Sequence, residues 1–250
     1  MDCKNCSHTY DGKFCPNCGQ NSRANKKLVF SELVNDFFDN VFNVNKGLPY
    51  TFFNLIVNPG MVGRAYILGK RKRFTNPVRY LIIAVAIQAF IDYWFIHPEL
   101  TEQPDFFYFS FLTERINDNM AIWNHTLATK YAFIHNISMI LIFPMAFLVL
   151  FKKYGFNFTE LLTVNFYYFS TGLILTISTI LIFDQIIMIN LPVPFIIMVT
   201  LGYVVWSNMK FFDSVSFWER LLKVVLALFI FMIIRVFFVV YVLSIIFPVI

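Results

Sequence analysis

The chain consists of a polar N-terminal region followed by long apolar stretches separated by short polar segments. Five stretches are long enough to cross a bilayer, because a membrane-spanning helix needs about 20 apolar residues. They cover residues 78–97, 131–151, 161–183, 186–206 and 221–247. The pattern predicts an all-α polytopic membrane protein with its helical membrane domain at residues 78–250. Pro192, Pro194 and the short turn before the fourth stretch leave two alternatives, four spans or a re-entrant hairpin near Asp184.

An amphipathic pattern precedes the spans, in residues 28–77. In "FSELVNDFFDNVFNV", residues 30–44, apolar side chains share one helical face, polar side chains share the other, and Ser31 is a candidate N-cap. Two further segments, "LPYTFFNLIV" and "MVGRAYILGKRKRF", are too polar to span. We expect helices that lie in the cytoplasmic headgroup region, that pack on the membrane domain, or that do both.

Composition and charge agree with a membrane protein and orient it. Of the 250 residues, 58% are hydrophobic and 14% are charged, whereas soluble domains average about 45–50% and about 25%. Basic and non-basic loops alternate along the chain, which predicts a cytoplasmic N-terminus and an external C-terminus. The first residues lack the apolar core of a signal peptide, so we expect the first span to direct insertion.

All four cysteines lie in residues 1–24, which we expect to form a zinc ribbon. Their spacing is Cys3-x2-Cys6-x8-Cys15-x2-Cys18, and Asp11-Gly12 between the pairs is typical of a two-residue hairpin turn. Four thiolates around Zn²⁺ leave no open position, so the site is predicted to be structural, and His8 is expected to be a surface residue. The alternative is two disulfides, which a cytoplasmic location disfavours. The polar segment "GQNSRANKK" after the ribbon is predicted to be a hinge.

The ribbon with "CPNCG", "NPG" at residues 58–60, "YILGKR" at 66–71 and "NP" at 76–77 followed by Tyr80 resembles domain-of-unknown-function family 3667. The resemblance covers about residues 1–95. It implies a bacterial inner-membrane protein with an N-terminal zinc ribbon. Because that family has no assigned activity, the resemblance implies no reaction.

Ionisable residues inside the predicted spans are candidates for function. Asp92 and Arg235 each lie 14 residues beyond the start of their span, about 21 Å from its cytoplasmic end at the helical rise. The two side chains are therefore predicted to pair, with Gln88 and His135 nearby. One interpretation is a polar site or a permeation pathway, and the other is an interhelical contact that holds the bundle.

A basic run, Lys70, Arg71, Lys72 and Arg73, adjoins the first span. It is either a binding site for anionic lipid headgroups or a topology signal alone. It is not a phosphate loop, because the glycine spacing is wrong and Arg71 follows Lys70 where Ser or Thr is required.

Three functional classes follow. The first is a membrane-anchored scaffold or regulator whose ribbon docks a cytoplasmic protein partner. The second is a small transporter or lipid-handling protein that uses Asp92 and Arg235. The third is a membrane enzyme, which is disfavoured because the sequence has no H-E-x-x-H, no G-x-S-x-G and no other convergent catalytic set. We expect no nucleic-acid partner.

Overall fold

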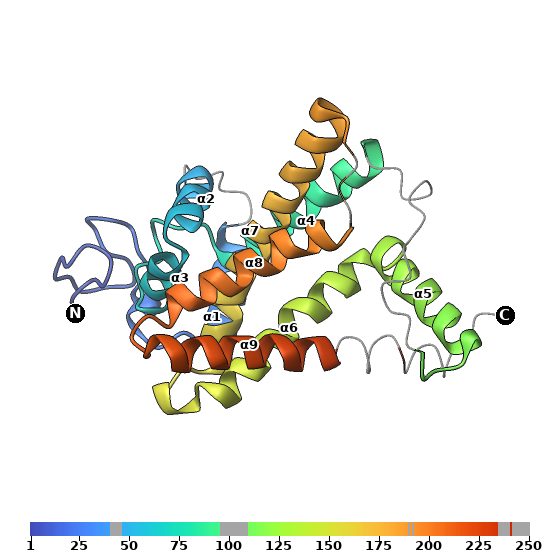
Figure 1. Ribbon diagram of the computed structural model, residues 1–250. Coiled ribbons are helices and arrows are strands. Elements are labelled where there is room, and N and C mark those ends of the chain that lie inside the picture. Colours follow the sequence, from blue (N-terminus) through green and yellow to red (C-terminus); the bar gives the residue numbers. More distant parts are fainter. Residues whose placement is uncertain (41–46, 96–109, 190, 192, 235–240, 242–250) are drawn as a thin grey trace.

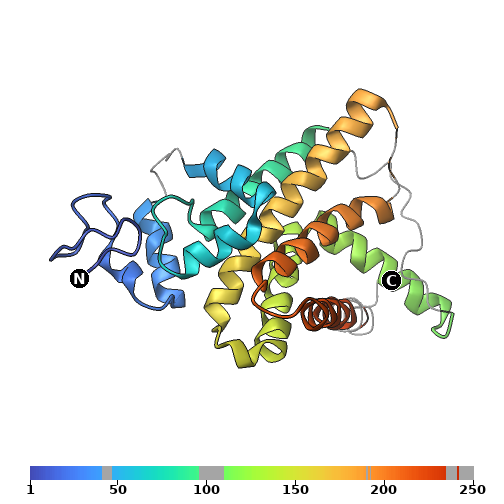
Figure 2. The same ribbon diagram turned by 60° about the vertical axis from the view of Figure 1, so that its left-hand side comes forward.

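The computed structural model describes residues 1–40, 47–95, 110–189, 191, 193–234 and 241, and across them the protein is all-helical. The N-terminal ribbon contains two isolated antiparallel bridges, Asp2 with Thr9 and Phe14 with Asn21. Two views, Figures 1 and 2, place this ribbon at one end of the molecule and helix α5 (Glu114–Thr129) at the other. The predicted all-α class is therefore confirmed for the described residues.

Each amphipathic segment before the first span forms a helix. These helices are α1 (Phe30–Asn40), α2 (Gly47–Val57) and α3 (Pro59–Ile67). Ser31 is not the N-cap of α1, because the first helical hydrogen bonds end on the carbonyl of Val29 and Ser31 lies within the first turn. Asn58 caps α3, since its Oδ1 accepts from the N–H of Met61 at 3.2 Å.

A long helix overlaps each of the five apolar stretches, and residues 235–240 and 242–247 of the fifth stretch lie outside the described residues. These helices are α4 (Pro77–Trp94), α6 (Ala132–Leu150), α7 (Phe158–Leu181), α8 (Val193–Phe211) and α9 (Phe217–Ile233). Helix α7 lies at the centre and packs against α4, α6 and α8. Within the described part of the chain, one helix, Phe158–Asp184, is long and apolar enough to cross a membrane. The five-span arrangement therefore stays a prediction.

The turn between α7 and α8 changes the predicted start of the fourth stretch. A π-helical turn at Ile182–Ile187 ends α7, and Met188 has a left-handed φ of 59°. Helix α8 therefore begins at Val193 instead of Ile186, with Pro194 in its first turn, where the missing N–H of proline costs no helical hydrogen bond. The two helices then lie antiparallel, with the hydroxyls of Thr176 and Thr200 in hydrogen-bond contact.

Buried tyrosines of α7 and α8 hold the turns between the N-terminal helices. The hydroxyl of Tyr203 donates to the carbonyl of Leu55 at 2.9 Å. This carbonyl lacks its helical partner because residue 59, four positions on, is a proline without an N–H. Two similar bonds run from Tyr168 to the carbonyl of Pro59 and from Tyr167 to the carbonyl of Thr75.

Helix α3 lies directly against the C-terminal end of α8. The Nη1 of Arg64 donates to the carbonyls of Lys210 at 2.7 Å and Phe211 at 2.9 Å, and it pairs with Asp213 at 2.7 Å. These carbonyls belong to the last turn of α8, where a cation is favourable. At Gly60 the backbones are so close that an added Cβ would lie 2.2 Å from the oxygen of Lys210. This contact requires glycine.

Helix α5 lies between the first two apolar stretches, where the hydropathy pattern marked no helix. It begins at Glu114 and ends at Thr129, and it carries mostly polar residues. The aromatic residues at 105–112, just before α5, lie largely outside the described residues. Hydropathy missed α5 because its composition is neither apolar nor clearly amphipathic.

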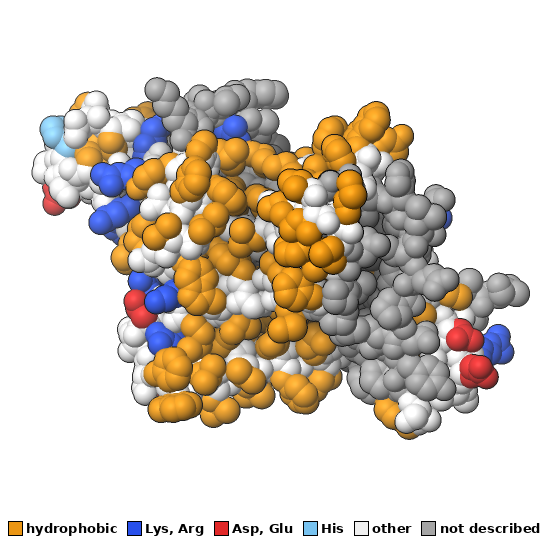
Figure 3. Space-filling view, turned by 45° about the horizontal axis from the view of Figure 1, so that its top comes forward, with side chains coloured by type: hydrophobic (Ala, Val, Ile, Leu, Met, Phe, Trp, Pro, Cys, Tyr) orange, Lys and Arg blue, Asp and Glu red, His pale blue; other side chains and the backbone are white. Residues whose placement is uncertain are grey.

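The surface is unusually apolar. Figure 3 shows hydrophobic side chains across most of one face, with Lys and Arg gathered at the edge beside the ribbon. Large exposed apolar residues occur on helices α4, α6, α8 and α9, among them Phe90, Met145, Met198 and Phe229. Contiguous apolar surface of this kind is typical of a face that contacts lipid or a partner.

Candidate metal centre

The ribbon contains two cysteine turns with the same hydrogen-bond pattern. In the first turn, the N–H of Ser7 donates to the carbonyl of Cys3 at 2.7 Å, and the N–H of Cys3 donates to the carbonyl of His8 at 3.0 Å. This closes the backbone around the sulfur atoms of Cys3 and Cys6. The His8 side chain is exposed and lies outside the four-sulfur group, as the sequence predicted.

The second turn repeats the first. The N–H of Gly19 donates to the carbonyl of Cys15 at 2.8 Å, and the N–H of Cys15 donates to the carbonyl of Gln20 at 2.9 Å. Gly19 has a φ of 69° and the equivalent Ser7 has a φ of 60°, so both turns need a left-handed residue directly after their second cysteine. Serine occupies this position in the first turn and glycine occupies it in the second.

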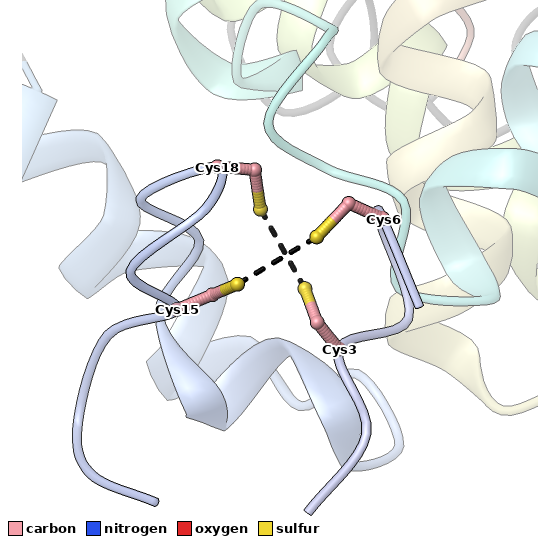
Figure 4. Close-up of side chains that lie close together, drawn as sticks. All are labelled: Cys3, Cys6, Cys15 and Cys18. Carbon is pink, nitrogen blue, oxygen red and sulfur yellow. Dashed lines mark hydrogen bonds between the residues drawn. The ribbon is translucent and has the colours of Figure 1, made fainter. Parts of the chain in front are cut away.

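Four sulfur atoms converge between the two turns, as Figure 4 shows. The Sγ of Cys3 lies 3.6 Å from that of Cys18, and the Sγ of Cys6 lies 3.6 Å from that of Cys15. All four lie within 4.8 Å of one another. Four ligands at the usual Zn–S distance of about 2.3 Å have sulfurs about 3.8 Å apart in a tetrahedron. The four thiols are free, not disulfide-bonded, and their arrangement is compatible with zinc.

The pKa values of two of the thiols are shifted in opposite directions, one by a backbone hydrogen bond and the other by burial. A hydrogen bond from the backbone N–H of His8 lowers the pKa of Cys6 to about 6. Burial raises the pKa of Cys18 to about 11. A metal ion such as Zn²⁺ deprotonates the thiols that coordinate it. The backbone therefore assists the metal at one ligand, whereas at the other the ion itself must supply the free energy of deprotonation.

The ribbon is fixed to the helical part of the protein by Gln20, so the predicted hinge at "GQNSRANKK" is wrong. Gln20 is 3% exposed. Its Nε2 donates to the carbonyl of Gly69 at 2.8 Å, and its Oε1 accepts from the N–H groups of Arg71 at 3.2 Å and Lys72 at 3.3 Å. One buried amide thus satisfies three backbone groups of a segment about fifty residues away.

A short 3₁₀ helix, Ser22–Asn25, completes this junction. The side chain of Asn25 accepts from the N–H of Lys4 at 3.2 Å and donates to the carbonyl of Asp2 at 3.1 Å, which ties it to the first cysteine turn. Gly69 has a φ of 96°, and an added Cβ there would lie 2.4 Å from the oxygen of Ala24. The "YILGKR" segment and the ribbon therefore pack backbone against backbone.

Replacing Gln20 with methionine tests this junction. We expect a loss of about 1–3 kcal/mol, because the methionine side chain fits the space but leaves buried backbone donors and an acceptor without partners. The measurement is the midpoint of thermal unfolding, together with the rate of tryptic cleavage after Arg23, Lys26 and Lys27, which remain in both variants. Lys13→Met, at an exposed position of the same ribbon, is the control, and an equal shift in the two variants would contradict the junction.

The structure separates Arg71 from the other three residues of the basic run. Arg71 is 7% exposed, and its Nη1 lies 3.5 Å from Oε2 of Glu32 in α1. Lys70, Lys72 and Arg73 are exposed. A lipid surface would therefore meet these three side chains, while Arg71 faces the interior of the junction.

The predicted intramembrane group remains a prediction. Gln88 lies in α4 and is half-buried. Arg235 lies outside the described residues, and the side chains of Asp92 and His135 are also outside the description. The structure therefore does not test the predicted pairing of Asp92 with Arg235.

Sequence reasoning missed Gln20 and the tyrosines that hold the turns. A signal for Gln20 was present, because it follows Cys18-Gly19 at the position that His8 occupies in the first turn. Only the fold shows which of these two residues faces the helices. No comparable signal marks the tyrosines, since Tyr203 and Leu55 are far apart in the sequence and meet only in the folded protein.

Together, these features define an all-helical protein whose four-cysteine ribbon is docked on its N-terminal helices. The family model described as a protein of unknown function, DUF3667, matches residues 45–89 and supports membership of this family. The match covers α2, α3, most of α4 and the residues that bind Gln20, namely Gly69, Arg71 and Lys72. No curated protein and no solved structure matches the chain.

Proposed function

We propose that this protein is a multi-pass inner-membrane scaffold or regulator whose cytoplasmic zinc ribbon docks a cytoplasmic protein partner. The observation that carries the proposal is the closed group of four sulfurs on a ribbon clamped to the helices by Gln20. A four-thiolate site has no open position for a substrate, so its role is structural. A rigid module held at the end of a membrane domain is suited to presenting a surface.

The outer surface of the ribbon is the part available for docking. Its inner side is covered by the junction with "YILGKR", whereas His8, Lys13 and Pro16 are exposed. Asp2 and Asp11 are exposed on the same ribbon, so its surface combines charges of both signs with apolar atoms. A partner that offers side chains of both charges and apolar groups is therefore the chemical match.

The loops expected in the cytoplasm gather at the ribbon end of the molecule, which supports the proposed orientation. Lys27, just after the ribbon, donates to the carbonyl of Gly155 at 3.0 Å in the loop after α6. In the same loop, Lys153 pairs with Glu219 at the start of α9 at 2.6 Å. Hydrogen bonds from Lys153 and Lys223 lower the pKa of Glu219 to about 2, so this network keeps its charges at neutral pH.

The orientation can be tested with the native thiols, because all four cysteines of the chain lie in the ribbon. We expect a membrane-impermeant maleimide to leave the protein unlabelled in intact cells and to label it after permeabilisation in the presence of a zinc chelator. A serine variant of all four cysteines measures background labelling. Labelling in intact cells treated with the chelator would place the ribbon outside.

The docking role can be tested with a photo-crosslinking amino acid at Lys13, at the exposed tip of the ribbon. We expect a discrete protein adduct in membranes, and we expect Cys18→Ser to abolish it because the ribbon loses its fold. The matched control is the same photo-crosslinker at Lys152, an exposed lysine of the loop after α6.

Adducts that persist in the Cys18→Ser variant, or that form equally from position 152, would show that the folded ribbon does not select the partner. If no ribbon-dependent adduct forms in membranes, this result would favour the intramembrane alternatives based on Asp92 and Arg235.

A further inference from the structure

Helix α2 has one covered face and one uncovered face. Thr51 and Leu55 are buried. On the opposite face, Tyr50, Phe53 and Val57 are 43%, 64% and 77% exposed. These three positions have the i, i+3, i+7 spacing that places side chains on one side of a helix. Because α2 contains no charged residue, its uncovered face is apolar along the length of the helix.

The length of α2 limits what can cover this face. The helix has 11 residues, which rise about 16 Å, whereas the hydrocarbon core of a bilayer is about 30 Å thick. Helix α2 therefore cannot cross a bilayer, and a lipid contact must lie at the interface of one leaflet. Tyr50 and Phe53 suit this depth, since aromatic rings are favoured at the boundary between headgroups and acyl chains.

Positive charge adjoins the apolar face of α2. The sequence contains no Asp or Glu in residues 40–91. Lys70, Lys72 and Arg73 are exposed, and none of them pairs with an acidic residue in the described part of the chain. Arg73 lies directly beside the start of α2, because a Cβ added to Gly47 would lie 3.4 Å from the carbonyl oxygen of Arg73.

An anionic bilayer surface matches this combination better than a protein partner does. Lysine is depleted from protein–protein interfaces, whereas each Lys or Arg beside a membrane is attracted to anionic headgroups. The apolar surface also continues toward α8. The hydroxyl of Tyr203 contacts Leu55 of α2, and the ring of Tyr203 lies 5.8 Å from that of the exposed Trp206. In Figure 3, basic side chains border the apolar face in the same way.

We infer that α2 is an interfacial anchor that binds an anionic bilayer surface. Phe53 and Val57 enter the boundary between headgroups and acyl chains, and the three exposed cations contact lipid phosphates. The N–H of Thr75 donates to Oγ1 of Thr51 at 2.9 Å, which holds the basic segment against α2, so both parts meet the same leaflet. The inference rests on the proposed membrane location and is independent of the proposed protein partner.

The test places an aromatic photo-crosslinking amino acid at Phe53, whose exposed side chain it replaces without disturbing the buried face. The full-length protein is held in bilayer discs of phosphatidylcholine and phosphatidylglycerol. We expect lipid adducts by mass spectrometry, with phosphatidylglycerol enriched above its share of the bilayer. The same photo-crosslinker at Phe229, an exposed residue of α9, tests the membrane location itself. Lys13, at the exposed tip of the ribbon, should give no lipid adduct.

The variant Lys70→Gln with Arg73→Gln tests the role of charge. Each basic residue beside a membrane favours anionic lipid by about fivefold, so we expect the phosphatidylglycerol enrichment at position 53 to fall by about fivefold or more. The matched control, Lys13→Gln with Lys152→Gln, removes the same charge from exposed positions outside this segment. It should change the enrichment by less than about twofold, because exposed charges are screened over short distances.

The possible outcomes separate the anchor from the membrane location. Lipid adducts from position 229 without any from position 53 would overturn the anchor and leave the proposed membrane protein intact. If neither position gives a lipid adduct, the membrane location fails as well. An adduct of two protein chains at position 53 would assign the face to a second copy instead of lipid. An equal loss of enrichment in both double variants would attribute the lipid preference to overall charge and contradict the role of the three cations.

Discussion

Replacing Cys18 with serine is expected to abolish stable zinc binding and to unfold the ribbon. The Sγ of Cys18 lies 3.6 Å from that of Cys3 and completes the group of four sulfurs. A domain of this size has little apolar core of its own, so metal binding provides most of its folding free energy, about 10–16 kcal/mol in zinc-finger peptides. The wild-type protein should retain one zinc ion per chain after dialysis against a weak chelator, whereas the variant should retain almost none.

The matched control for this experiment is His8→Ser. His8 is exposed and its side chain is not one of the four ligands, so this variant should keep its zinc. Metal content measured by mass spectrometry and tryptic cleavage within residues 1–28 give two independent readouts. Equal zinc content in wild type and Cys18→Ser would rule out the four-sulfur site.

Gly60→Ala is expected to destabilise the helical part of the protein by about 3 kcal/mol or more, beyond the usual cost of an extra methyl group in a packed interior. The added Cβ would lie 2.2 Å from the carbonyl oxygen and 2.5 Å from the carbonyl carbon of Lys210. Both are backbone atoms, so no side-chain rotation relieves the contact. Helix α3 must move away from α8, which also weakens the hydrogen bonds of Arg64 to the end of α8.

Gly202→Ala is the control for this prediction. Gly202 lies within α8, and an added Cβ there meets nothing within 4 Å. Alanine favours a helix over glycine by up to about 1 kcal/mol, so the control should be neutral or slightly more stable. Thermal unfolding followed by tryptophan fluorescence separates the two variants. Similar midpoints for both would show that α3 and α8 are not in direct backbone contact.

Features determined by nearby residues could be predicted from the sequence. The two cysteine pairs were recognisable because the ligands and the turns that shape them lie within a few residues of one another. The amphipathic segments and the apolar stretches were recognisable because each contains its own periodicity. Within the described residues, a helix overlaps each of these segments, and the late start of α8 is explained by local backbone geometry at Met188 and Pro194.

Features determined by distant contacts could not be predicted in this way. Gln20 was read as part of a hinge because its three partners lie about fifty residues further on. Arg71 resembles its basic neighbours in the sequence, and only the position of Glu32 in α1 distinguishes it. Helix α5 has a composition close to that of a loop, so neither hydropathy nor periodicity marked it.

The bond between Gln20 and the backbone of residues 69–72 has a thermodynamic consequence. Gln20 follows Cys18 by two residues, so the state of the metal site and the position of Lys72 belong to one linked equilibrium. Linkage is reciprocal: if metal binding stabilises the contact of the ribbon with residues 69–72 by some factor, the intact contact raises the affinity for the metal by the same factor. A change that loosens this contact should therefore also weaken metal binding.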